Sequence, residues 1–185
     1  MSKSKIISTK TPYQNKYLTL IEDLIQYSNG DQDIYSYIVK KPSVLIIPYD
    51  PSTDTFYLVK QYRHPHQKEF IEFPAGGIEK NETPKQAALR ELEEETSLTT
   101  NSLFPLGFFH SDIGTRKSIT HLFLALSPTP SPHPHPQNKH EKTQLLKISH
   151  SNLKDYFKTG KVNETWALSA YTLFLLKYPD FSQYV

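Results

Sequence analysis

Short apolar runs separated by turn-forming residues make up most of this chain. Residues 17–27 and 34–39 are rich in aromatic and β-branched side chains, and the Ser-Asn-Gly-Asp sequence between them is a turn signal. This pattern predicts an N-terminal hairpin. Further short apolar runs predict strands, in chain order, at residues 43–49, 56–62, 70–73, 103–109, 121–126 and 145–148.

Two longer stretches have helical character. Thr83 and Gln86 form a capping-box pattern around Pro84, and alanines and leucines follow them in one stripe, so a helix is expected to begin here. Residues 163–178 also have helical length and an apolar face. This order of strands and helices predicts an α/β fold in which a mixed sheet lies between helices. Residues 127–137 are rich in proline, which predicts an exposed loop.

Length and composition narrow the class of protein. A chain of 185 residues is expected to form one domain with a small N-terminal addition. With 21 basic and 19 acidic residues the net charge is +2, which gives no reason to expect a nucleic acid or a membrane as partner. The chain has no cysteine, so disulfides and thiolate chemistry are excluded. No segment has the apolar core of a signal peptide or the length of a membrane span, so a cytoplasmic protein is expected.

The expected helix after Thr83 carries an unusual concentration of acid. Glu91, Glu94 and Glu95 are spaced i, i+3 and i+4, which places their carboxylates on one face. Like charges at this spacing repel by roughly 0.2–0.5 kcal/mol per pair, so a positive partner is expected beside them. Hard cations such as Mg²⁺ take oxygen ligands and share them with substrate phosphates. The sequence therefore predicts a divalent-metal platform for phosphate chemistry.

The same stretch resembles the signature of the Nudix hydrolase superfamily. That signature is glycine, five residues, glutamate, seven residues, and then Arg-Glu-aliphatic-x-Glu-Glu-x-Gly-aliphatic. The matching positions here are Gly76, Glu82, Arg90, Glu91, Leu92, Glu94, Glu95 and Leu98, and Ser97 stands where the family has glycine. The resemblance implies a Nudix-type α/β/α sandwich with a mixed sheet. It also implies an N-terminal β extension at residues 1–40, followed by the hydrolase domain at residues 41–185.

Residues 59–63 (VKQYR) and 72–77 (EFPAGG) look like the ADP-ribose pyrophosphatase and nucleoside diphosphate sugar hydrolase branch of that superfamily. This implies Mg²⁺-dependent hydrolysis of a pyrophosphate bond, giving a nucleoside monophosphate and a sugar phosphate, by a homodimer joined through the N-terminal extension. The loop at residues 111–118 departs from the pattern of the branch, because only Gly114 matches it. Other nucleoside diphosphate sugars therefore remain possible substrates. A nucleoside triphosphate or dinucleotide substrate is one alternative. A non-catalytic nucleotide sensor is another, although every acidic position of the signature is present.

The resemblance also assigns roles around the metal. Glu91 and Glu95 are the principal expected ligands of Mg²⁺, or of Mn²⁺ as the alternative, with Glu94 assisting and the backbone carbonyl of Ala75 completing the set. Glu94, Glu95 and Arg90 are thus counted as catalytic. Glu82 and Arg90 are expected to support the metal ligands, and Arg90 can pair with a carboxylate and hold this segment in shape, or form an ordinary pair on the helix surface.

Substrate-binding residues are expected outside the acidic helix. Arg63 can bind phosphate oxygens with its guanidinium fork, or be an ordinary surface charge. Glu72 can accept a hydrogen bond from a ribose hydroxyl or join the metal network. Tyr35, in the N-terminal extension, is a candidate for stacking on the nucleobase. Glu141, just after the proline-rich loop, is the candidate general base by analogy with the branch, and no spacing singles out a histidine as its rival.

Overall fold

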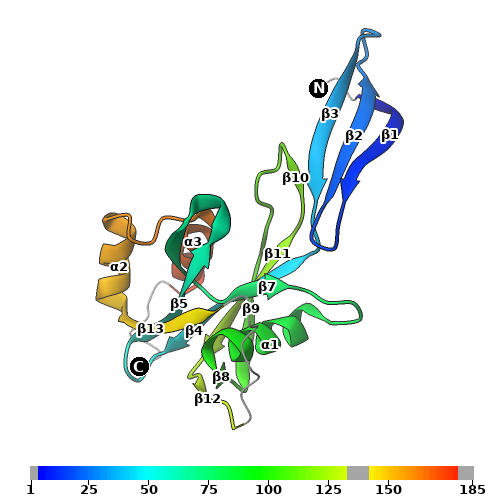
Figure 1. Ribbon diagram of the computed structural model, residues 1–185. Coiled ribbons are helices and arrows are strands. Elements are labelled where there is room, and N and C mark those ends of the chain that lie inside the picture. Colours follow the sequence, from blue (N-terminus) through cyan, green and yellow to red (C-terminus); the bar gives the residue numbers. More distant parts are fainter. Residues whose placement is uncertain (1–3, 133–141, 179–185) are drawn as a thin grey trace. The chain divides into compact units, whose positions relative to one another are not determined.

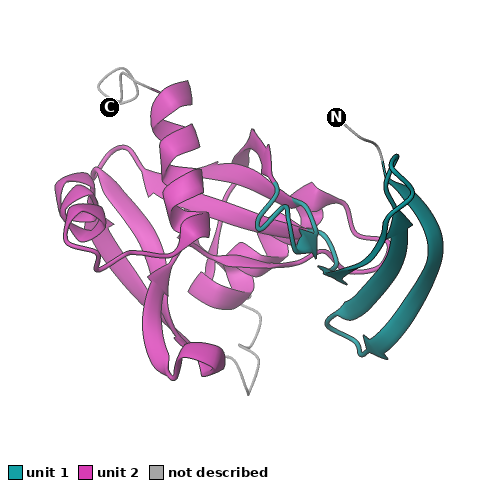
Figure 2. Cartoon of the chain, turned by 90° about the horizontal axis from the view of Figure 1, so that it is seen from above, with its two compact units in different colours: residues 1–42, 110–119 teal, residues 43–109, 120–185 magenta. Residues whose placement is uncertain are grey.

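A computed structural model of the protein describes residues 4–132 and 142–178. The chain forms two compact units (Figure 2). Unit 1 comprises residues 1–42 and 110–119, and unit 2 comprises residues 43–109 and 120–185. The unit boundary near residue 42 lies close to the expected end of the N-terminal extension, but the short segment at residues 110–119 joins unit 1 as well. None of the described helices is long and apolar enough to cross a membrane.

Unit 2 is built on a seven-stranded mixed sheet (Figure 1). Its main path runs β13 (Thr143–Ser149), β5 (Thr55–Arg63), β4 (Ser43–Asp50), β11 (Thr120–Leu126) and β9 (Ser102–Phe109). Strand β6 (Lys68–Glu72) pairs with β5, and β7 (Ala75–Gly77) pairs with β4. Strand β11 is parallel to β4, while the other pairs are antiparallel. The expected mixed sheet is therefore present.

Strands β4 and β5 separate soon after the turn that joins them. They pair only through Tyr49 with Phe56 and Asp50 with Thr55. Beyond that point β6 lies along β5, β7 lies along β4, and the amide of Ile46 donates to the carbonyl of Pro74 at 2.9 Å. The separation of β4 and β5 positions the short β7 backbone beside the acidic helix.

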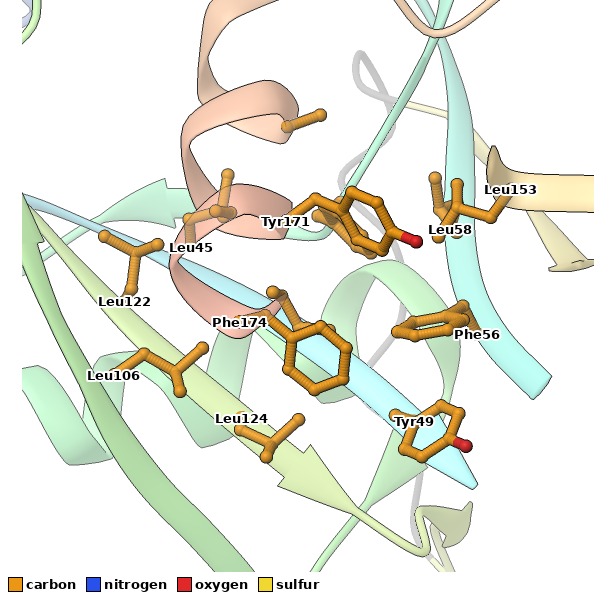
Figure 3. Close-up of a cluster of buried hydrophobic side chains, with 14 of the residues drawn as sticks. Leu45, Tyr49, Phe56, Leu58, Leu106, Leu122, Leu124, Leu153, Tyr171 and Phe174 are labelled. Carbon is orange, nitrogen blue, oxygen red and sulfur yellow. The ribbon is translucent and has the colours of Figure 1, made fainter. Parts of the chain in front are cut away.

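Alternating side chains of β4 supply a core on each face of the sheet. Val44 and Ile46 belong to a buried cluster with Ala88 and Leu92 of α1 (Pro84–Thr96). Leu45 and Ile47 belong to a second cluster, covered by α2 (His150–Lys158) and α3 (Thr165–Lys177). In Figure 3, Tyr171 and Phe174 of α3 point into this second cluster. Two helical layers around one sheet make the α/β/α sandwich that the sequence predicted.

Several elements of unit 2 were not predicted. They are the whole of α2, the short strand β7, a 3-10 turn at His64–His66, and a two-stranded pair of β8 (Leu98–Thr99) with β12 (Thr129–Pro130). Helix α2 has the sequence HSNLKDYFK, and Leu153 is its single buried residue. The helix is therefore too short to show a repeating pattern of apolar residues in the sequence. Ser149 caps it, since its hydroxyl accepts from the amide of Asn152 at 3.4 Å.

Unit 1 contains a four-stranded sheet in the order β1 (Lys5–Gln14), β2 (Thr19–Gln26), β3 (Gln32–Val39) and β10 (Arg116–Lys117). Strands β2 and β3 form the predicted hairpin. Strand β1 was not predicted because it holds Pro12 and several polar residues. Its pairing with β2 shifts register between Lys10 and Tyr13, and this irregularity accommodates the proline.

Candidate active site

Helix α1 begins where the sequence predicts. Thr83 and Gln86 form the capping box, with the Thr83 amide donating to Gln86 Oε1 at 2.9 Å and the Gln86 amide donating to Thr83 Oγ1 at 3.3 Å. Ser97 ends the helix in the left-handed conformation, at φ 57°, and its amide donates to the carbonyl of Glu93 at 2.8 Å. A residue with a Cβ pays roughly 1–2 kcal/mol for this conformation. Ser97 therefore replaces the signature glycine without changing how the helix ends.

Gly76 allows α1 to lie directly against β7. A Cβ built at Gly76 would stand 2.0 Å from the carboxyl carbon of Glu91, so any larger residue would displace that side chain. One residue earlier, the amide of Ala75 donates to Glu95 Oε2 at 3.0 Å. The β7 backbone thus contacts two of the candidate metal ligands, and the carbonyl of Ala75 belongs to the same short strand.

Arg90 connects the acidic side chains to one another. Its Nε donates to Glu82 Oε1 at 2.9 Å, and its Nη1 donates to Glu91 Oε1 at 2.7 Å and to Glu94 Oε2 at 3.0 Å. Its Nη2 donates to the carbonyl of Gly77 at 2.9 Å. The hydrogen bonds from Arg90 hold the pKa of Glu82 below its usual value. Arg90 and Glu82 thereby join the loop before α1 to the helix.

Arg63 and Glu72 meet at the edge of the β5–β6 hairpin. Arg63 Nε donates to Glu72 Oε1 at 2.9 Å, and Nη2 donates to Glu72 Oε2 at 2.5 Å. The side chain of Glu72 is 13% exposed and that of Arg63 is 41% exposed. Such a bidentate pair fixes the guanidinium plane. The two residues expected to bind substrate are therefore brought together, and Glu72 orients the fork of Arg63.

Burial makes ionisation of the central carboxyls unfavourable. Burial, with a smaller contribution from the charge of Glu91, raises the pKa of Glu95 to about 8 even though the hydrogen bond from the Ala75 amide lowers it. Burial also raises the pKa of Glu91, although Arg90 opposes this. Groups in such surroundings gain most from a nearby cation, because only added positive charge restores the ionised form.

The chemistry of these donors fits a hard divalent cation. Carboxylate oxygens of Glu91, Glu94 and Glu95 and the carbonyl of Ala75 are the ligand types that Mg²⁺ prefers. Within the described ranges, however, no three acidic or histidine side chains already form a cation cluster. The cause is visible in the hydrogen bonds, since Glu95 is turned to the Ala75 amide and Arg90 holds Glu91 and Glu94. Cation binding at this site requires these side chains to turn.

Two predicted site residues are not among the described residues of unit 2. Tyr35 lies in unit 1, where its hydroxyl donates to the carbonyl of Gly114 at 2.5 Å and its ring lines an open cavity of about 650 Å³. Tyr37, Lys40, Arg116 and Lys117 also line this cavity. Glu141 lies outside the described residues, so its predicted role as general base stays a prediction.

Sequence reasoning also missed a carboxyl group of unit 2. Glu164 caps α3, and its side chain accepts from the amides of Trp166, at 2.7 Å, and Ala167. Burial raises its pKa, and the charge of Glu72 adds to that shift. The Asn-Glu-Thr sequence before an apolar run was the available signal, but glutamate is an uncommon cap.

A helix that gathers carboxylates against a glycine-containing strand, beside a bidentate arginine–glutamate pair, defines a site for chemistry on phosphates. The NUDIX domain family profile matches residues 39–163, and the chain belongs to this family. It is a Nudix hydrolase, and the predicted resemblance to the ADP-ribose pyrophosphatase branch is confirmed.

Relatives of known name cover most of the chain. The ADP-ribose pyrophosphatase of Bacillus subtilis is 29% identical over 170 residues, which cover 91% of this chain and 90% of the relative. The methanol dehydrogenase activator of Bacillus methanolicus is 28% identical over 161 residues, covering 87% and 86%. Among solved structures, one described as an ADP compounds hydrolase has a TM-score of 0.83 at 23% identity, covering 98% of this chain and 96% of that one. The structural likeness confirms the predicted fold.

Proposed function

We propose that this Nudix hydrolase cleaves the pyrophosphate bond of ADP-ribose or a related nucleoside diphosphate sugar, with Mg²⁺ as cofactor and Mn²⁺ as the alternative. The products are a nucleoside monophosphate and a sugar phosphate. The observation that carries the proposal is the convergence of Glu91 and Glu95 on the backbone of β7, with Glu94 bound to Arg90, which also binds Glu91. The names of relatives such as the Bacillus subtilis enzyme support the substrate class.

Each side chain of the site has a task that its position suits. Glu91, Glu94 and Glu95, with the carbonyl of Ala75, supply the oxygen ligands. A bound divalent cation would neutralise phosphate charge and lower the pKa of water. Arg90 keeps the carboxylates of Glu91 and Glu94 close together before binding. It also remains available to balance the negative charge of the site.

Arg63 is the proposed phosphate-binding residue. Its guanidinium presents donors in a planar fork, and the exposed part of this side chain can bind phosphate oxygens while Glu72 fixes its plane. Tyr35 is proposed as a nucleobase-binding residue because its ring lines the cavity of unit 1, and stacking contributes about 1–3 kcal/mol per base. Glu141 is the proposed general base.

A substrate panel tests the proposal. The purified full chain would be incubated with Mg²⁺ and with nucleoside diphosphate sugars, dinucleotides and nucleoside triphosphates, and kcat/KM measured for each. The highest values are expected for the diphosphate sugars. Higher values for triphosphates or dinucleotides would move the substrate to another class of diphosphate. Binding of nucleotides without turnover of any would favour the sensor.

A further inference from the structure

Gln61 has a buried amide oxygen that none of the described residues binds. The residue is 7% exposed, and its Oε1 has no hydrogen-bond partner. Across residues 4–132 and 142–178, this oxygen is the single buried side-chain oxygen or nitrogen without a hydrogen-bond partner. A buried acceptor left unpaired is costly, and native proteins place such groups where a water, ion or ligand will supply the missing donor. Neither the metal ligands nor the substrate residues assigned above include it.

The strand register places Gln61 beneath α1. It lies on β5 opposite Thr143 of β13 and Phe70 of β6. Residues on one strand share a face with every second neighbour, and Tyr57, four residues earlier, belongs to the core cluster that α1 covers. Gln61 therefore points to the face of the sheet that carries the acidic helix.

The carboxylate site flanks Gln61 on two sides. Directly opposing residues of an antiparallel pair have Cβ atoms about 4.5–5.5 Å apart. One such neighbour is Thr143, whose hydroxyl donates to the backbone carbonyl of Glu95 at 2.8 Å. Two residues further along β5, on the same face, Arg63 binds Glu72. Gln61 thus lies between the residue that holds the end of α1 and the arginine–glutamate pair.

Donors on both flanking side chains are engaged with other acceptors. The Thr143 hydroxyl has a single proton, which Glu95 accepts, and Arg63 directs Nε and Nη2 to Glu72. None of the described residues donates to the oxygen of Gln61, so it can accept from a water that enters with a cation. Mg²⁺ usually keeps several of its waters when it binds to protein carboxylates, and these waters carry protons that need acceptors.

We propose that Gln61 is a positioning residue of the cation site, whose amide oxygen accepts a hydrogen bond from a water that the divalent cation holds. The inference rests on the proposed function, because it needs a cation at Glu91 and Glu95. A neutral amide suits this task, since it orients water without adding a charge that would repel the substrate phosphates. Replacing a residue that hydrogen-bonds to a ligand of a metal typically lowers the affinity for the metal, or the activity, by about 10–100-fold.

The test measures cation binding in the absence of nucleotide. Mn²⁺ would be titrated into the full chain, and free Mn²⁺ followed by electron paramagnetic resonance. Gln61→Met keeps the length of the side chain and removes the amide, so its Kd for Mn²⁺ should rise about 10–100-fold. Gln61→Glu keeps an acceptor oxygen and should bind Mn²⁺ at least as tightly as Gln61→Met. Gln144→Met, an exposed glutamine on β13, is the matched control and should bind like the wild type.

Thermal melting without metal separates this role from a structural one. The Gln61 oxygen accepts no hydrogen bond from the described residues that the change to methionine could remove, so the melting temperature of Gln61→Met should equal or exceed that of the wild type. Wild-type affinity for Mn²⁺ in Gln61→Met would overturn the inference. So would a fall of several degrees in its metal-free melting temperature, which would mark Gln61 as structural. A wild-type chain that does not bind Mn²⁺ would refute the metal site of the proposed function itself, and the inference with it.

Discussion

Replacing Glu95 by glutamine should separate the chemistry of the site from the stability of the fold. Glutamine keeps an oxygen that can accept from the Ala75 amide, as Glu95 does at 3.0 Å. It removes the charge that a hard cation needs in a ligand. We therefore expect kcat to fall by at least about 10²-fold, since a metal site supplies several kcal/mol of transition-state stabilisation.

The same substitution should stabilise the metal-free protein at alkaline pH. Burial raises the pKa of Glu95 from 4.5 to about 8. The native state therefore holds the proton more tightly than the unfolded chain does. The stability that this proton contributes is fully present below pH 4.5 and is lost as the pH rises through 8. At about 1.4 kcal/mol per pKa unit the full loss would be roughly 5 kcal/mol. Because Glu95 keeps partial contact with solvent, we expect about half of this or less, roughly 2 kcal/mol.

Thermal melting in EDTA at pH 5 and pH 9 measures this difference. For a chain of this size, 2 kcal/mol corresponds to a gain of about 4–8 °C in Tm for the variant over the wild type at pH 9. The gain should be much smaller at pH 5. The matched control is Glu93→Gln, because Glu93 lies on the same helix but accepts from the hydroxyl of Ser131 at 2.7 Å. This control should keep its activity and show no such pH-dependent gain.

Two results would refute this reasoning. Near-normal turnover by Glu95→Gln would show that the cation binds elsewhere. An equal difference in Tm at pH 5 and pH 9 would show that burial does not hold a proton on Glu95. If turnover is lost and the pH-dependent gain is also absent, Glu95 binds the cation but is not desolvated before it binds.

Three further predictions concern the remaining residues. Arg63→Ala should raise KM by about 10–100-fold, since hydrogen bonds to charged groups are worth about 1.5–3 kcal/mol. Arg63→Lys should not restore the KM, because lysine lacks the planar fork. An unchanged KM in steady-state kinetics would place phosphate binding elsewhere. Glu141→Gln should lower kcat by about 10²–10⁴-fold with little change in KM, and retention of most kcat would move the general base to Glu94, Glu95 or a metal-bound hydroxide. Light scattering should give twice the chain mass of 21.4 kDa, because all of β1 is exposed at a sheet edge; a monomer at micromolar concentration would contradict this.

Local patterns in the sequence were enough to predict the centre of the site. The capping box, the i, i+3 and i+4 glutamates and Gly76 are all features of adjacent residues. For that reason the position of α1 and the face that carries its glutamates follow from the order of residues alone. The short strand β7 was not predicted, and its contact with α1 became visible only in the fold.

Features that depend on pairing between distant segments were not predictable in this way. The separation of β4 from β5, and the arrival of β13 beside β5, bring Thr143 next to Gln61 across 82 positions of sequence. Nothing near Gln61 in the sequence distinguishes it from an ordinary strand glutamine. Likewise, the sequence suggested phosphate as the partner of Arg63, whereas the fold first pairs it with Glu72.

Product analysis after incubation with ADP-ribose tests the central claim most directly. The full chain would be incubated with ADP-ribose in Mg²⁺ and, in parallel, in excess EDTA, and the products separated by liquid chromatography. The account predicts AMP and ribose 5-phosphate in equal amounts with Mg²⁺ and unchanged ADP-ribose in EDTA. Cleavage that continues in EDTA, or release of ADP and free ribose, would contradict it.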